Sequence, residues 1–95
     1  MLTIKEARYL VSGRLRAISP SENPFILDDS KVIEKAFGWV FFYNSQKFME
    51  TRNDICRLAG NGPIIINKFT HDILILGTDK PANVLIEEYE GQQNY

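Results

Sequence analysis

Residues 37–44 read FGWVFFYN, a run of bulky aromatic side chains with one valine and no proline that is typical of a β-strand. Alternate residues of a strand point to opposite faces, so one face is expected to receive four aromatic side chains: Phe37, Trp39, Phe41 and Tyr43. Val40 and Phe42 fall on the other face. Both faces of this strand are therefore apolar, and a folded protein must cover both.

Further strands are predicted on either side of this run. Pro63–Lys68 and Asp72–Leu76 are rich in isoleucine and leucine, and the three residues between them predict an antiparallel hairpin. Phe25–Asp28 and Lys31–Lys35 flank Asp29-Ser30, a pattern compatible with one bent or bulged strand. None of these strands alternates apolar with polar residues in the way that a sheet with one wet face requires.

A helix is expected at each end of the chain. Thr3 and Glu6 form a capping-box pattern ahead of an amphipathic helix over residues 4–17. Pro81 fits the first position of a second helix with one apolar stripe, and residues 91–95 are expected to be a frayed tail.

The region between the aromatic strand and the isoleucine strands has weaker signals. Asp54 is a candidate N-cap for a short helix through Leu58, ended by Gly60. Gly60-Asn61-Gly62-Pro63 predicts a sharp turn in which glycine and asparagine supply positive φ. Reading these glycines as an anion-binding loop fits less well, because they lead into a strand rather than a helix.

These elements predict an α+β fold: an antiparallel sheet of about four strands with an N-terminal and a C-terminal helix packed on it, in the order α-β-β-β-β-α. Residues 1–95 are expected to form a single domain. The two helices are expected to cover one face of the sheet. The other face must be covered by strand curvature and residues 45–59, or else by another protein. That protein could be a second copy of the chain, so the sequence is also compatible with a homodimer.

Composition excludes several classes of protein. Apolar runs are too short for a membrane span, the N-terminus lacks the apolar core of a signal peptide, and one cysteine forms no internal disulfide. We therefore expect a cytoplasmic protein. A net charge of −1 argues against nucleic acid as a partner. Basic residues gather near the N-terminus and acidic ones near the C-terminus, which fits either neighbouring termini or two separate solvated faces.

The sequence contains no group of residues typical of a catalytic site. A lone Cys56 and a lone His71 are weak grounds for a thiol nucleophile with its base, and His71 fits an exposed turn. Asp28-Asp29 reads as a turn, and Glu87-Glu88 on a helix point in different directions. The sequence therefore predicts no enzyme, no cofactor and no metal site.

Several blocks together resemble one family. FGWVFFYNS at residues 37–45 and AGNGPIII at residues 59–66 are fairly specific at their mutual spacing, and LGT at 76–78 and IEEYE at 86–90 follow. In these blocks the chain is similar to the bacterial immunity protein 35 (YrhB-like) family. Residues 16–31 and 48–58 match only loosely.

The resemblance implies a gene beside a polymorphic toxin gene and a product that binds and blocks its cognate toxin domain in bacterial competition. A chaperone-like protein that holds unfolded clients on an apolar sheet face is the alternative. The residues of these motifs belong to types that usually stabilise a fold rather than contact a partner. They are Gly38, Trp39, Gly60, Asn61, Gly62 and Pro63. The candidate partner-binding residues are polar and aromatic side chains that flank the aromatic strand: Tyr43, Lys47, Phe48, Arg52 and Asp54. The alternative is that these five residues are ordinary surface residues or belong to a small secondary core.

Overall fold

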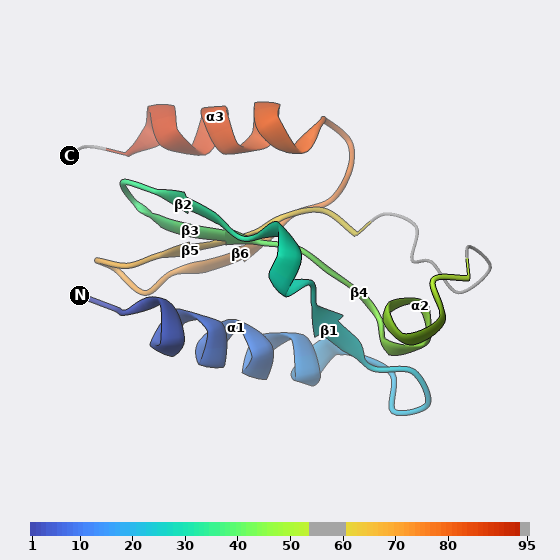
Figure 1. Ribbon diagram of the computed structural model, residues 1–95. Coiled ribbons are helices and arrows are strands. Elements are labelled where there is room, and N and C mark those ends of the chain that lie inside the picture. The colour runs from blue at the N-terminus through green and yellow to red at the C-terminus, as the bar shows by residue number, and fades with distance from the viewer. Residues whose placement is uncertain (54–60, 94–95) are drawn as a thin grey trace.

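Helices and short strands follow one another along the chain in the computed structural model, which describes residues 1–53 and 61–93. Figure 1 shows their arrangement. In order, the elements are α1 (Ile4–Ile18), β1 (Phe25–Leu27), the 3-10 turn η1 (Asp29–Lys31), β2 (Ile33–Lys35), β3 (Gly38–Phe41), β4 (Tyr43–Ser45), α2 (Gln46–Thr51), β5 (Ile64–Asn67), β6 (Ile73–Ile75) and α3 (Ala82–Gln92).

Two antiparallel sheets make up the β-structure of the described residues. The larger sheet has the strand order β2-β3-β5-β6, and the smaller pairs β1 with β4. The fold is thus α+β with a helix at each end, as predicted. The β5–β6 hairpin is confirmed, with Ile65 opposite Leu74.

The aromatic run does not form one continuous strand. It divides at Phe42 into β3, which lies in the larger sheet, and β4, which lies in the smaller one. The single bent strand expected around Asp29-Ser30 is likewise two strands in different sheets. The cause is η1, where the Asp28 side chain accepts a hydrogen bond from the Ser30 N–H at 3.1 Å and turns the chain between β1 and β2.

The larger sheet lies between the two terminal helices, with α1 on one face and α3 on the other (Figure 1). The expectation that both helices share one face is therefore wrong. On the α1 side, Val11 and Leu15 pack in one core with Trp39, Phe41 and two isoleucines of β5, Ile64 and Ile66. The smaller core on the α3 side joins buried residues of the sheet and the helix: Phe37, Val40, Ile65 and Ile86. One helix per face explains why no strand alternates apolar with polar residues.

Phe37 faces α3, opposite to Trp39, although simple alternation predicts the same face. The reason is Gly38, whose φ of 149° lies outside the range that L side chains readily adopt. A Cβ at Gly38 would also lie 2.9 Å from the Lys68 amide nitrogen of the neighbouring chain segment. Gly38 thus reverses the direction of the side chain that precedes it.

The turn into β5 depends on close packing rather than on positive φ. Gly38 is the only glycine of the described residues with positive φ, so the φ predicted for Gly62 is wrong. A Cβ at Gly62 would instead collide with the carbonyl oxygens of Gly77 and Leu76. Pro63 is fully buried, and its carbonyl accepts the Leu76 N–H at 3.0 Å. Gly60 lies outside the described residues.

The capping box of α1 is confirmed, because the Thr3 Oγ accepts the Glu6 N–H and the Glu6 carboxylate accepts the Thr3 N–H. The Thr3 N–H that donates to the carboxylate is the largest influence that lowers the pKa of the exposed Glu6 carboxyl. Pro81 is the residue before α3 rather than its first position. α3 continues through Gln92, so the tail expected from Gly91 is partly helix.

The basic N-terminal segment and the acidic C-terminal segment take part in different ion pairs. Arg8 of α1 forms a bidentate ion pair with Asp29, while Lys80 pairs with Glu88 at 2.6 Å beside α3. Each pair raises the pKa of its cation. No ion pair of the described residues joins the two ends, and both readings of the charge pattern stay predictions. Among the helices of the described residues, none has the length and apolarity that crossing a bilayer demands.

Candidate partner-binding surface

The two-stranded β1–β4 sheet, η1 and α2 form one end of the molecule, which we call the α2 end. Figure 1 shows it opposite the start of α1 and the end of α3. Three of the five predicted partner-binding positions lie on α2 or at its C-terminal boundary, and Tyr43 lies on β4.

α2 was not predicted from the sequence. Ser45 is its N-cap, with the hydroxyl accepting the Phe48 N–H at 3.2 Å. Arg52 ends the helix in the left-handed conformation, with φ 56°, and its N–H donates to the Phe48 carbonyl at 2.7 Å. The Ser45 cap was the available signal. The helix predicted after Asp54 lies outside the described residues.

The five predicted residues divide into two groups. Tyr43 and Phe48 are only 9% and 8% exposed, and the Tyr43 ring lies 5.5 Å from that of Phe25. Burial raises the pKa of the Tyr43 hydroxyl. Lys47 and Arg52 are exposed, and Asp54 lies outside the described residues. The two aromatic residues thus hold the α2 end together, and the two cations lie at its surface.

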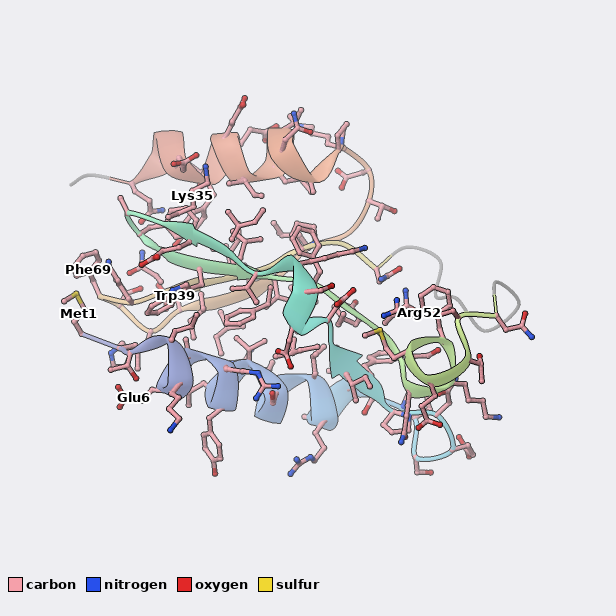
Figure 2. The ribbon with its side chains drawn as sticks, viewed as in Figure 1. Met1, Glu6, Lys35, Trp39, Arg52 and Phe69 are labelled. Atoms are coloured by element: carbon pink, nitrogen blue, oxygen red, sulfur yellow. The ribbon has the colours of Figure 1, made fainter. Side chains whose placement is uncertain are left out.

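The Arg52 side chain packs on an aromatic ring of α2. Its guanidinium carbon lies 5.5 Å from the centre of the Phe48 ring, in a cation–π contact, and Figure 2 labels it beside α2. Arginine and aromatic residues are enriched among the residues that dominate protein interfaces. An arginine held on a buried ring loses less conformational entropy on binding than a free one.

Hydrogen bonds from distant segments fix this end to the rest of the molecule. The Asn61 Nδ2 donates to the Tyr43 carbonyl at 2.6 Å. The Lys47 N–H donates to the Asn23 Oδ1 at 3.0 Å, and the Gln46 N–H donates to the Pro24 carbonyl at 2.8 Å. Asn61 thus connects the segment before β5 to β4.

A polar recess of about 210 Å³ opens at the α2 end, with Asp28, Tyr43 and Asn61 in its wall. The Asp28 carboxylate accepts the Ser30 hydroxyl at 2.6 Å and lies 3.9 Å from the Lys31 ammonium. The Ser30 hydroxyl is the largest influence that lowers the pKa of Asp28. Asp28 therefore holds the turn η1, and the recess offers hydrogen-bonding groups without a nucleophile and its base.

The other candidates for chemistry do not come together. His71 is exposed in the β5–β6 turn with φ 68°, as expected for a turn residue, and Cys56 lies outside the described residues. Glu88 pairs with Lys80 and not with Glu87. Over residues 1–53 and 61–93, no three His, Cys, Asp or Glu side chains are grouped as metal ligands.

A second surface was not predicted from the sequence. A groove of about 460 Å³ lies between α1 and β1, with Ser12 and Arg16 on one wall and Phe25–Leu27 on the other. It depends on β1 having a single strand partner, a property of the topology that no local sequence pattern reveals.

Comparison with known proteins gives one family and one curated relative. The model of the family described as immunity protein 35 matches residues 5–92. An uncharacterized protein of Escherichia coli (strain K12), YrhB, is 43% identical over 53 residues, which are 56% of this chain and 56% of YrhB. The match thus spans little more than half of that relative's length. No solved structure is significantly similar.

Proposed function

This chain belongs to the immunity protein 35 family, and on that premise we propose that it binds one cognate toxin domain in the bacterial cytoplasm and neutralises it by occlusion. The observation that carries the proposal is the family match over residues 5–92, which includes every helix and strand from α1 to α3 except the first residue of α1.

The architecture suits a protein that acts through its shape. Both faces of the larger sheet are packed against helices, and no buried side-chain nitrogen or oxygen atom of the described residues lacks a hydrogen-bond partner. Such a scaffold holds its surface before the partner arrives, and preformed surfaces lower the entropic cost of binding. A protein that occludes its target needs no reactive group of its own.

We place the contact surface at the α2 end, on the residues predicted there: Tyr43, Lys47, Phe48, Arg52 and Asp54. Lys47 and Arg52 make the direct contacts, because they are exposed, while Tyr43 and Phe48 support them from below. Two cations at this surface favour an acidic patch on the toxin domain.

The chaperone-like alternative receives less support. It requires an open apolar sheet face for unfolded clients, whereas α1 and α3 cover the two faces of the larger sheet (Figure 1). Ile33 and Leu74, on the outer strands, remain partly exposed beside α3, and they are too few to form a broad client-binding face.

The direct test mixes this protein with the toxin domain encoded by the neighbouring gene and measures toxin activity against molar ratio. Occlusion predicts a loss of activity that is complete near one equivalent, together with a complex of defined stoichiometry by light scattering. Neutralisation by a small fraction of an equivalent would mean turnover and would contradict the proposal. General suppression of aggregation in unrelated proteins, without inhibition of the toxin, would favour the chaperone-like alternative.

A further inference from the structure

β1 has one paired edge and one free edge. Among the strands of the described residues it pairs only with β4, with Ile26 opposite Asn44. The Gln46 N–H donates to the Pro24 carbonyl and the Asp28 N–H donates to the Phe42 carbonyl, so the backbone groups of even-numbered residues face β4. In an antiparallel pair the intervening residues point their N–H and C=O groups the other way. The backbone groups of Phe25 and Leu27 therefore point away from β4.

These outward groups are available for pairing. Within residues 1–53 and 61–93, neither the Phe25 N–H nor the Leu27 N–H makes a hydrogen bond. Unpaired strand edges are templates for another strand, and proteins normally protect them with charged side chains, prolines or covering segments. β1 itself carries only Phe25, Ile26 and Leu27, with Ile26 exposed. Its free edge has none of those protections within the strand.

The free edge borders a groove rather than a flat surface. The groove of about 460 Å³ has β1 along one wall and α1 along the other, where Ser12 and Arg16 lie. α1 therefore supplies a polar wall beside the strand. An added strand would find backbone partners on one side and hydroxyl and guanidinium donors on the other.

The groove carries one uncompensated positive charge. Arg8 and Asp29 at one end neutralise each other, with the Arg8 Nε 2.8 Å from the Asp29 Oδ1. Arg16 is exposed and forms no ion pair with any residue in the described part of the chain. An incoming segment with a carboxylate opposite Arg16 would form a charge-assisted hydrogen bond there.

We propose that an extended, acidic segment of the toxin domain adds to the free edge of β1, pairs with the backbone of Phe25 and Leu27, and places a carboxylate on Arg16. This mode of binding is β-strand addition, in which backbone hydrogen bonds give affinity and side-chain contacts give specificity. The inference rests on the proposed function and names the segment that this protein recognises. β1 belongs to the α2 end, and Pro24 in the wall of the groove accepts the N–H of Gln46 in α2, so the groove and the exposed cations of α2 can contact one partner.

A second copy of this chain fits the same edge less well. Its own β1 has no acidic residue to place on Arg16. The carboxylates that follow β1 are engaged, Asp28 with Ser30 and Asp29 with Arg8. Dimerisation through β1 would appear as a dimer by sedimentation, with slow exchange of the Phe25 and Leu27 amide protons in the absence of the toxin, and would overturn the proposal.

The test is amide hydrogen exchange by NMR on the full chain, free and bound to the toxin domain of the neighbouring gene. We expect the Phe25 and Leu27 amide protons to exchange at least about tenfold more slowly in the complex, because each gains a hydrogen bond. A complex in which both protons exchange as fast as in the free protein overturns the inference and leaves the proposed function standing.

Charge reversal on one helix gives matched variants. Arg16→Glu should weaken toxin binding about tenfold or more, whereas Arg14→Glu, which lies against the β5–β6 turn instead, should leave it within about twofold. Unchanged thermal unfolding of both variants would show that the fold is intact. Equal effects of the two substitutions would overturn the inference, since they would indicate a general charge effect.

If no complex forms, the proposed function fails. Titration with a terminally blocked heptapeptide of alternating valine and glutamate then tests separately whether the groove binds an acidic strand. Chemical-shift changes confined to Ser12, Arg16 and residues 25–27, absent with the valine–lysine peptide, would show that the groove accepts acidic strands. Absence of those changes would overturn the inference as well.

Discussion

Gly62 lies directly against the carbonyl group of Leu76. The Gly62 N–H donates to the Leu76 oxygen at 3.2 Å, and a Cβ on Gly62 would lie 2.5 Å from that same oxygen. The return bond from the Leu76 N–H to the Pro63 carbonyl, at 3.0 Å, extends the pairing of β5 and β6 beyond Ile64. The absence of a side chain at residue 62 thus lets the two segments approach.

Gly62→Ala should therefore destabilise the protein by about 1–3 kcal/mol, because the methyl group must displace backbone rather than a flexible side chain. Urea denaturation at pH 7 measures the change. Gly13→Ala is the matched control, since a Cβ there meets nothing within 4 Å and alanine favours a helix by about 1 kcal/mol. The two substitutions should shift the midpoint in opposite directions. A rise of the urea midpoint in both variants would show that the backbone around Gly62 accommodates the methyl group without loss of stability.

Trp39→Ala should cost about 3–5 kcal/mol, because Trp39 is 6% exposed and packs in the core on the α1 side. Tyr9→Ala on the outer surface of α1 is the comparison, with Tyr9 80% exposed and an expected change within about 0.5 kcal/mol. Thermal unfolding by circular dichroism measures both. Similar stabilities of the two variants would mean that Trp39 contributes no more to the core than a surface residue does.

The regular parts of this fold were predictable because their signals are local. The Thr3–Glu6 capping box, the isoleucine strands of the β5–β6 hairpin and the helix at each end of the chain all follow from spacing and residue type. What escaped prediction depends on contacts distant in sequence. Gly38 turns Phe37 toward α3 through its backbone conformation, and the helices divide between two faces because both faces of the sheet are apolar.

The candidate site was predictable only in part. The sequence predicts Tyr43 and Phe48 as contact residues because they flank the aromatic strand. Both side chains are buried, since α2 folds back over β4, and the sequence pattern does not reveal α2. Lys47 and Arg52 are exposed as a contact surface requires. The groove beside β1 could not be predicted, since it depends on which strand edge the chain leaves unpaired.

Tyr89 fastens α3 to the sheet. Its hydroxyl accepts a hydrogen bond from the buried Asn67 Nδ2 at 3.1 Å, and its ring meets Phe37 edge to face with centroids 4.7 Å apart. Tyr89→Phe keeps the ring contact and should cost about 0.5–1.5 kcal/mol. Tyr89→Ala should cost at least about 1 kcal/mol more in urea denaturation, because the aromatic contact is lost as well. Equal losses in the two variants would assign the whole effect to the hydroxyl.

The stability of this protein should fall in acid partly through Asp28. The pKa of this buried carboxyl is lower in the folded than in the unfolded chain, chiefly because the Ser30 hydroxyl donates to it. The ionised form thus stabilises the fold above the unfolded value of about 4, and this contribution disappears as pH falls through the folded pKa.

Asp28→Asn should be about 1–2 kcal/mol less stable than the natural chain at pH 7, and the difference should narrow as the pH falls from about 4 toward 3. Urea midpoints between these pH values measure the difference. Glu22→Gln, an exposed carboxylate in the loop after α1, should leave the pH profile unchanged. A constant gap between Asp28→Asn and the natural chain at all pH values would assign the loss to packing rather than charge.

Arg52 should dominate binding at the α2 end. Its position over the Phe48 ring holds the guanidinium ready for a carboxylate of the toxin domain, so its removal should raise the Kd about tenfold or more. Arg52→Asn is the suitable change, because asparagine tolerates the left-handed conformation with φ 56° that Arg52 adopts. Lys47→Ala should have a smaller effect, and Lys5→Ala on α1 should have none. Calorimetric titration of the toxin domain into each variant measures these constants. If Lys5→Ala and Arg52→Asn weaken binding equally, the contact is a diffuse charge effect and the α2 end is not the binding surface.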